Sequence, residues 1–221
     1  MQRTPEPELM DDAAQALAYA RADFNEPNTA FVDHVSAALP ELRRSTILDL
    51  GCGPGDITLR LAARFPDARV IGVDGAGAML ALAHEALAAH PRLAPRVGFV
   101  HAMLGALPQD IAGVDAVVSN SLLHHLPDPA LLWSVVARAG RRGATVVVMD
   151  LARPPSVEDA ARIVATHAAG EPAVLREDFH NSLLAAYTPE EVRLQLAAAG
   201  LAGIEVRSVS DRHWLAVGRL P

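Results

Sequence analysis

The chain has 221 residues, half of them hydrophobic and only 4% aromatic, so Ala, Leu and Val must form most of its core. This length suits one α/β domain with a substantial core. The net charge of −7, with acids and bases mixed along the chain, argues against a basic nucleic-acid-binding face, and we expect no nucleic-acid partner.

Cysteine content and hydropathy predict a cytoplasmic globular protein. Cys52 is the only cysteine, which excludes an intramolecular disulfide and a multi-cysteine zinc site. The first twelve residues are polar and acidic, unlike a secretory signal. No run approaches the roughly 20 apolar residues that span a bilayer.

Residues 1–40 are predicted to form N-terminal helices that could cover a pocket. The first ten residues contain two prolines and several charges, which predicts a frayed end. The helical pattern breaks at residues 25–28, so we expect Asn28 or Thr29 to cap a second helix that Pro40 ends.

Strands alternate with helices over residues 45–150, the half expected to bind a cofactor. Short apolar runs separated by helical segments indicate right-handed βαβ units and a mostly parallel sheet. The expected strands are 46–50, 69–74, 97–101, 115–119 and 144–150, with helices at 57–65, 76–89 and 129–139.

The pattern changes over residues 151–221, the expected substrate side. We expect helices at 156–169 and 189–199, the second opened by a capping box at Thr188 and Glu191, then strands at 204–208 and 213–218. The polar stretch 167–187 is expected to be irregular, either a lid or a solvated connection. No repeat or linker divides the chain, so one domain over residues 1–221 is expected.

Three alternating glycines provide the sharpest local signal. Gly51, Gly53 and Gly55 follow the first strand and precede a helix. Glycine permits positive φ and close approach of a ligand, and open α/β sheets bind ligands at this edge. Asp74 ends the second strand, where nucleotide-binding βαβ units place an acid that binds ribose hydroxyls. Together these features predict a cofactor containing a nucleoside.

The spacing disfavours a dinucleotide. The loop reads G-x-G-x-G rather than G-x-G-x-x-G, and Asp56 near the helix start would repel a phosphate. An adenosine with an amino-acid tail avoids this conflict, because its ammonium is attracted to carboxylates such as Asp49. A nicotinamide-dependent oxidoreductase is therefore the weaker alternative.

Residues 49–55, 70–74 and 115–126 resemble the first motif, the second motif and the fourth-strand segment of the class I S-adenosylmethionine-dependent methyltransferases. The last of these segments, residues 115–126, is similar to the branch of that family that contains the ubiquinone/menaquinone-biosynthesis methyltransferases. The resemblance implies a single doubly wound, mostly parallel seven-stranded sheet with an antiparallel last strand. It also implies S-adenosylmethionine as cofactor and a small-molecule acceptor.

The same resemblance implies cofactor contacts. The glycines would pack on the methionine part, Asp74 would hold the ribose diol, and the Asn120 backbone would meet the ammonium. Relatives often carry an acid where this chain has Met103, which leaves either an apolar adenine contact or ordinary core packing there. The expected cofactor residues are Asp49, Gly51, Cys52, Gly53, Gly55, Asp74, Gly75, Met79, Ala102, Met103 and Asn120.

The acceptor is expected where the fourth and fifth strands end, near His124 and Asp150. Histidine acts as a base near neutral pH, but it also forms structural hydrogen bonds. The candidate catalytic residues are His124, Asp150 and His180, and the candidate substrate-binding residues are Tyr19, Phe24 and Tyr187.

No metal site is expected from the pair His124 and His125, because adjacent residues rarely converge on one ion and no carboxylate–histidine repeat accompanies them. A non-catalytic cofactor-binding protein stays open as an alternative. The sequence also leaves open a homodimer, the acceptor and the atom methylated.

Overall fold

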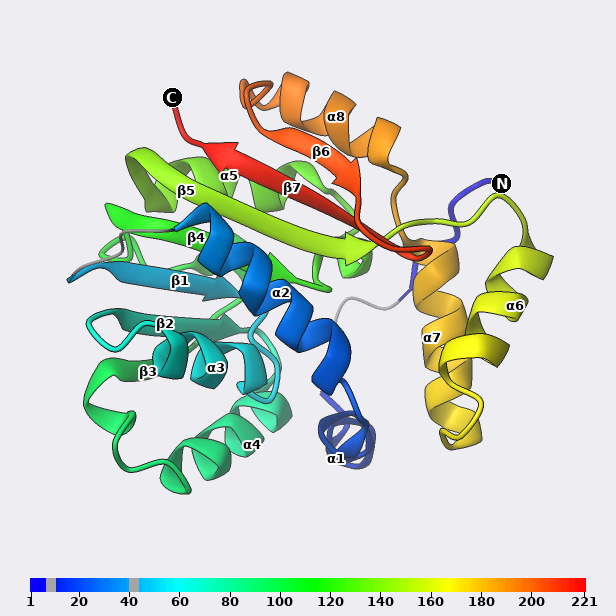
Figure 1. The fold of residues 1–221 in the computed structure, drawn as a ribbon, viewed down its shortest axis with the longest axis horizontal. Helices are drawn as coiled ribbons and strands as arrows, with labels where there is room; N and C mark the ends of the chain where they lie inside the picture. Colours follow the sequence, from blue (N-terminus) through cyan, green and yellow to red (C-terminus); the bar gives the residue numbers. More distant parts are fainter. Residues whose placement is uncertain (7–10, 40–43) are drawn as a thin grey trace.

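The computed structural model describes residues 1–6, 11–39 and 44–221. Within these residues seven strands form one sheet in the order β3-β2-β1-β4-β5-β7-β6 (Figure 1). β7 is antiparallel to β5 and β6, and the other neighbouring strands are parallel. The predicted sheet, with its first strand beside its fourth, is thus confirmed. The strands are β1 (Thr46–Leu50), β2 (Arg69–Asp74), β3 (Val97–His101), β4 (Val114–Asn120), β5 (Gly140–Leu151), β6 (Glu205–Ser208) and β7 (His213–Arg219).

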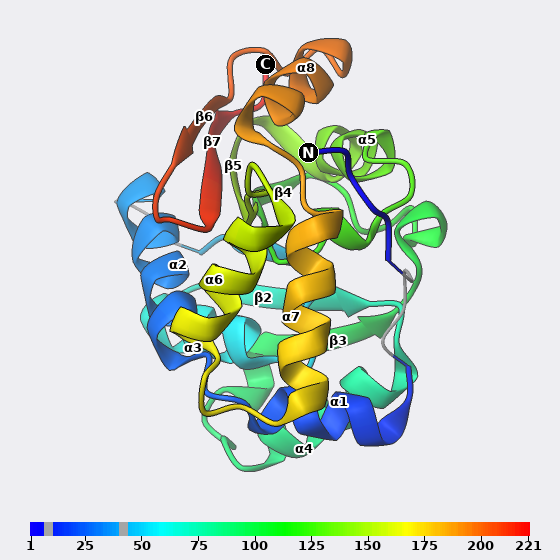
Figure 2. The same ribbon diagram turned by 90° about the vertical axis from the view of Figure 1, so that its right-hand side faces the viewer.

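Helices cover both faces of the sheet and one of its ends. α2, α3 and α4 pack on one face, and α5 and α8 pack on the other. α1, α6 and α7 lie at the end where the parallel strands have their carboxyl termini (Figures 1 and 2). The helices are α1 (Ala13–Arg21), α2 (Asn25–Ala38), α3 (Asp56–Arg64), α4 (Gly77–Ala88), α5 (Ala130–Ala139), α6 (Val157–His167), α7 (Ala173–Ala185) and α8 (Pro189–Ala198), with short 3₁₀ turns η1 (Ala94–Arg96), η2 (Leu104–Ala106) and η3 (Leu123–His125).

Two hydrophobic cores flank the sheet. Ile47 of β1 packs in the core that contains Phe31, whereas the next residue, Leu48, packs in the core that contains Trp133. Successive strand side chains point to opposite faces, so a strand buried on both sides needs apolar residues at most positions. This explains why the central strands are rich in apolar residues on both faces.

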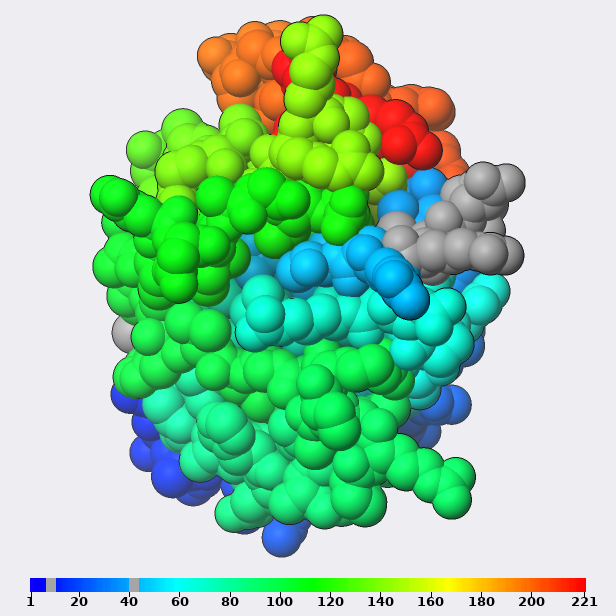
Figure 3. Space-filling model, turned by 90° about the vertical axis from the view of Figure 1, so that its left-hand side faces the viewer, coloured from blue at the N-terminus to red at the C-terminus, as the bar shows by residue number. Residues whose placement is uncertain are grey.

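The opposite end of the sheet is covered mainly by the connections that lead into the strands. Figure 3 shows this face, and the yellow and gold of α6 and α7 do not appear on it. The helical cover and the strand carboxyl ends therefore lie together, at the end where open α/β sheets bind ligands.

Two helix predictions need correction. α2 begins at Asn25, so the expected cap at Asn28 or Thr29 is wrong; Pro27 lies in its first turn, where a missing N–H costs nothing. The stretch expected to be irregular contains α7. Pro40, the expected end of α2, lies outside the described residues. The capping box at Thr188 and Glu191 is present.

Residues 1–6 are not a frayed end. The Arg3 guanidinium donates hydrogen bonds to the carbonyl oxygens of Ala185, His124 and Leu126. It also lies 4.2 Å from the centre of the Tyr187 ring. One side chain therefore fixes this segment against α7 and η3.

Across the described ranges, no helix has the length and apolar character needed to cross a membrane.

Gly55→Ala is expected to destabilise the fold. Gly55 has φ of +85°, and an added Cβ would lie 2.9 Å from the Phe99 ring and 3.0 Å from the Ala83 side chain. Gly53 is the matched control, because its φ of +51° is also positive but an added Cβ meets nothing within 4 Å. In thermal and urea unfolding we expect Gly55→Ala to lose roughly 1–3 kcal/mol. Equal losses in both variants would contradict the packing argument.

The free energy of unfolding should depend on pH through His213. Burial lowers the pKa of His213 to about 4. The unfolded chain then binds more protons than the folded chain between about pH 6.5 and 4, so stability falls as the pH falls through this range, by up to roughly 3 kcal/mol. Urea unfolding at pH 7.5, 6 and 5 should show a shallower decline for His213→Gln. Parallel curves for His213→Gln and the wild type would rule out this residue as the source.

Candidate active site

The glycine loop is held at the end of β1 by backbone hydrogen bonds. The N–H groups of Gly51 and Cys52 both donate to the carbonyl oxygen of Val73, at 2.8 and 3.0 Å. Gly51 has φ of +71°, and an added Cβ would lie 2.8 Å from the Leu122 side chain. The turn therefore requires glycine at this position, and it brings the ends of β1 and β2 together.

Asp74 joins this loop to the turn after β2. One carboxylate oxygen accepts from the Gly53 N–H at 2.7 Å, and the other accepts from the Ala76 N–H at 2.8 Å. Burial raises the pKa of Asp74 above its usual value, although both hydrogen bonds act in the opposite direction. The carboxylate thus lies at the floor of a cavity with its position fixed.

A first cavity of about 290 Å³ lies over this loop. Nine of the eleven expected cofactor residues line it: Gly51, Cys52, Gly53, Asp74, Gly75, Met79, Ala102, Met103 and Asn120. The cavity thus gathers residues from the ends of β1, β2, β3 and β4, as the sequence predicted.

Two expected cofactor residues lie behind the cavity rather than in it. Asp49 is 1% exposed and accepts a hydrogen bond from the Thr58 hydroxyl at 2.6 Å. Burial raises the pKa of Asp49 to about 7. Gly55 caps α3 and packs against Phe99. Both residues shape the loop from beneath, and neither lines the cavity in which the cofactor is expected.

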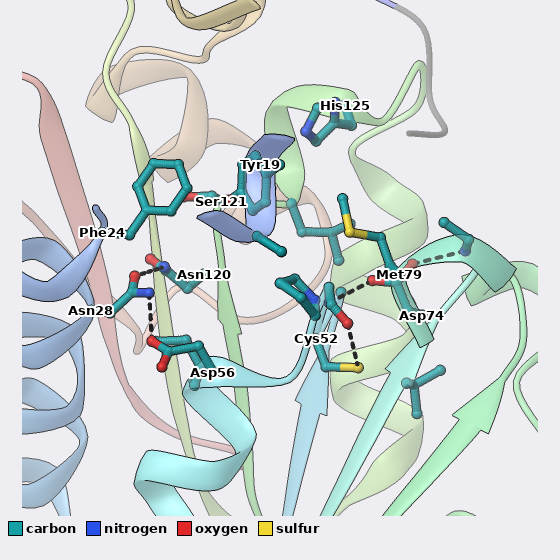
Figure 4. Close-up of a pocket in the computed structure, with 18 of the residues that line it drawn as sticks. Tyr19, Phe24, Asn28, Cys52, Asp56, Asp74, Met79, Asn120, Ser121 and His125 are labelled. Atoms are coloured by element: carbon teal, nitrogen blue, oxygen red, sulfur yellow. Dashed lines mark hydrogen bonds between the residues drawn. The ribbon is translucent and has the colours of Figure 1, made fainter. Parts of the chain in front are cut away.

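A second cavity, of about 350 Å³, shares a wall with the first. Tyr19 and Phe24 contribute from α1 and the turn after it, with ring centres 4.7 Å apart. Figure 4 shows them above the glycine loop, with His125 beside Tyr19. Residues that line both cavities are Tyr19, Ala22, Asp23, Phe24, Asn25, Asn28, Asn120, Ser121 and His125.

Hydrogen bonds attach α2 to the glycine-loop side of this wall (Figure 4). The Asn28 amide donates to Asp56 at 2.8 Å and accepts from the Asn120 amide at 3.5 Å. Arg60 pairs with Asp56 at 2.7 Å and also donates to Asn25 and Thr29. Asp56 therefore pairs with a guanidinium and accepts a hydrogen bond from an amide while it lines the first cavity.

His124 forms a buried ion pair with Asp150. Nδ1 of His124 lies 2.5 Å from a carboxylate oxygen of Asp150, and the two residues are 3% and 1% exposed. Burial alone would lower the pKa of His124, but the carboxylates of Asp150 and Glu6 outweigh burial and raise it. The same pairing lowers the pKa of Asp150 against the effect of burial.

The expected acceptor wall is only partly correct. β4 ends at Asn120, and Ser121, at φ of +56°, turns the chain into η3, so His124 does not end the strand. Tyr19, Phe24 and His124 line the second cavity. Among the residues that the structure describes, the lining of both cavities leaves out Asp150, His180 and Tyr187. Tyr187 is instead buried, and its hydroxyl donates to the carbonyl oxygen of Leu126 at 3.3 Å.

No motif or spacing pointed to Glu6 as a site residue. Its carboxylate lies 3.4 Å from Nε2 of His124 and 3.1 Å from Nδ1 of His125. We expected no metal site at these histidines because the side chains of adjacent residues rarely converge on one ion. In η3 their ring centres are 4.1 Å apart, and a distant carboxylate joins them.

Comparison with known proteins agrees with this geometry. Residues 47–143 match the family model described as a methyltransferase domain. The trans-aconitate 2-methyltransferase of Azoarcus sp. is 35% identical over 125 residues, 57% of this chain and 46% of that protein. The enzyme of that name from Methylobacterium nodulans is 32% identical over 161 residues, 73% of this chain and 56% of that protein. The chain therefore spans about half the length of these curated relatives.

Solved structures share the fold at low identity. A SAM-dependent methyltransferase from Aquifex aeolicus superposes with a TM-score of 0.69 at 17% identity, covering 95% of this chain and 99% of its own. Phosphoethanolamine N-methyltransferase 2 from Haemonchus contortus, in complex with S-adenosyl-L-methionine, superposes with a TM-score of 0.66 at 20% identity, covering 90% of this chain and 44% of its own. Residues 47–143 thus match a methyltransferase domain, and the strand order is that of the solved S-adenosylmethionine-dependent methyltransferases.

Proposed function

We propose that the chain transfers the methyl group of S-adenosylmethionine to a small molecule held in the second cavity. The observation that carries this proposal is the shared wall, which brings a cofactor in the first cavity against an acceptor in the second. The sulfonium already activates the methyl group, so the protein must mainly align the nucleophile with it. Alignment of this kind supplies about 7–11 kcal/mol in favourable cases.

The cofactor would lie along the carboxyl edge of β1, β2 and β4. Asp74 would accept from the ribose hydroxyls with the lone pairs that Gly53 and Ala76 leave free. Met79 and Met103 would flank the adenine ring. At the other end, the Asn120 backbone would meet the amino-acid ammonium, close to the shared wall.

The charges of the second cavity argue against a polycarboxylate acceptor. Within the described chain, four carboxylates line this cavity, against the single guanidinium of Arg212. Arg212 is already paired with Asp211 at 2.9 Å. We therefore propose a neutral or cationic acceptor rather than trans-aconitate, the substrate in the names of the curated relatives. The four carboxylates belong to Asp23, Glu26, Glu171 and Asp178.

A monomer or homodimer acting on free metabolites in the cytoplasm fits this proposal, without a nucleic-acid partner. The competing function is cofactor binding without catalysis. Incubation with isotope-labelled cofactor and matched amines, phenols and carboxylates, read by mass spectrometry, tests both. We expect labelled methyl on amines or phenols. Binding of S-adenosylhomocysteine with no methylated product from any class would favour the non-catalytic protein.

Asp74→Ala is expected to weaken S-adenosylhomocysteine binding by roughly 1.5–3 kcal/mol, the scale of a hydrogen bond to a charged group. Calorimetric titration measures this, with Asp67→Ala as control because Asp67 is exposed in the connection that leads into β2. Tight binding of NADH together with no binding of S-adenosylhomocysteine would contradict the cofactor assignment.

Removal of a side chain from one cavity should change the binding of the ligand in that cavity alone. Phe179 lines only the second cavity, and Met103 lines only the first. Phe179→Ala should raise the KM of the acceptor by roughly five- to thirty-fold, for about 1–2 kcal/mol of lost apolar contact. Met103→Ala should weaken S-adenosylhomocysteine binding instead. The assignment fails if both variants change the same parameter.

A further inference from the structure

Glu6, His124 and His125, here called the Glu–His–His cluster, converge beside the second cavity. One carboxylate oxygen of Glu6 lies 3.4 Å from Nε2 of His124 and 3.1 Å from Nδ1 of His125. The Glu6 side chain is 11% exposed, and those of the two histidines are 4% and 22% exposed. Both histidines line the second cavity. These three donor atoms are thus largely shielded from water but adjacent to the place proposed for the acceptor.

Hydrogen bonding does not account for this convergence. Nδ1 of His125 is buried without a hydrogen-bond partner among the described residues, although Glu6 is close to it. The distance from Glu6 to Nε2 of His124 exceeds the usual N–H···O range of about 2.7–3.2 Å. The 3.1 Å contact between Glu6 and Nδ1 of His125 lies within this range and attracts the carboxylate, but it lacks the geometry of a hydrogen bond. Two imidazole nitrogens therefore face one carboxylate oxygen without a well-directed hydrogen bond.

Asp150 fixes which nitrogen of His124 faces Glu6. Its carboxylate accepts from Nδ1 of His124, and also from the N–H groups of His124 and Leu151. With the Nδ1 proton held there, the Nε2 lone pair points toward Glu6. In many metal sites, a metal-binding histidine donates its other ring N–H to a carboxylate that orients the imidazole in this way. On the other side, the Ser182 hydroxyl contacts both oxygens of Glu6, at 3.1 and 3.3 Å.

We propose that the Glu–His–His cluster binds a divalent first-row transition cation. Imidazole nitrogen and carboxylate oxygen suit such ions, with bonds of about 2.0–2.2 Å. Ligand atoms at that distance and near-tetrahedral angles lie roughly 3.3 Å from one another, close to the 3.1 and 3.4 Å observed. With His124 neutral, as a metal ligand must be, the two carboxylates of Glu6 and Asp150 against the one guanidinium of Arg3 leave the surroundings negative before a cation enters.

A fourth coordination position would open toward the second cavity. There the ion would bind an oxygen or nitrogen atom of the acceptor. Binding of the acceptor by the ion rests on the proposed methyl transfer, whereas binding of the ion to the protein does not depend on it. The competing occupant is a proton: a protonated His124 would neutralise Glu6 and Asp150 but would still leave Nδ1 of His125 without a partner.

Zinc and cobalt titrations of the 221-residue chain, freed of metal with a chelator, test the proposal. Calorimetry should show one equivalent of Zn²⁺ bound with micromolar or tighter affinity, and Co²⁺ should give visible absorption bands of a low-coordinate site. Glu6→Gln and His125→Gln should each weaken binding by about ten-fold or more. His90→Gln, at an exposed position after α4, should bind like the wild type.

Thermal unfolding without metal checks that each variant is folded, and S-adenosylhomocysteine binding is measured in the same samples. The proposal is overturned if Zn²⁺ and Co²⁺ bind no tighter than millimolar, or if Glu6→Gln and His125→Gln bind as tightly as His90→Gln. A wild-type chain that does not bind S-adenosylhomocysteine would instead count against the methyltransferase proposal. It would leave the metal site untouched, because Glu6 does not line the cofactor cavity.

Discussion

The cofactor cavity depends on one carboxylate that is shared between two loops. Asp74 accepts from Gly53 in the loop after β1 and from Ala76 in the turn after β2. The carboxyl ends of β1 and β2 are already joined where Gly51 and Cys52 donate to the Val73 carbonyl oxygen, and Asp74 adds a link between the two loops beyond these ends. Asp74 is partly buried, where such hydrogen bonds are stronger than in water.

The two cavities differ in how they are assembled. The first is formed mostly by short segments that each follow their own strand, with one wall from α1 and α2 that it shares with the second, so local sequence determines most of it. The second needs α1, α2, α6, α7 and η3, which are distant from one another in the sequence. Distant pieces can vary independently, and this explains how one cofactor cavity can serve acceptors of different chemistry.

This difference also determines what the sequence could predict. Buried strands and the glycine loop have strong local patterns, and their positions agree with the structure to within a few residues. α7 was missed because polar residues such as Asp178 and Ser182 face the second cavity, which hides its helical periodicity. The turn at Ser121 moved His124 from the strand end into η3, since a positive φ at a non-glycine residue has no clear sequence signal.

The charged groups around His124 also come from segments that are distant in the sequence. A buried imidazole and carboxylate are favourable only together, because removal of one partner leaves the other charged and desolvated. Here Asp150 comes from β5, His124 from η3 and Glu6 from the segment before α1. Arg3 holds that same segment through carbonyl oxygens of η3 and α7, and its charge opposes protonation of His124. Separation of residues 1–6 from α7 would therefore remove a carboxylate and a guanidinium from the surroundings of His124 at once.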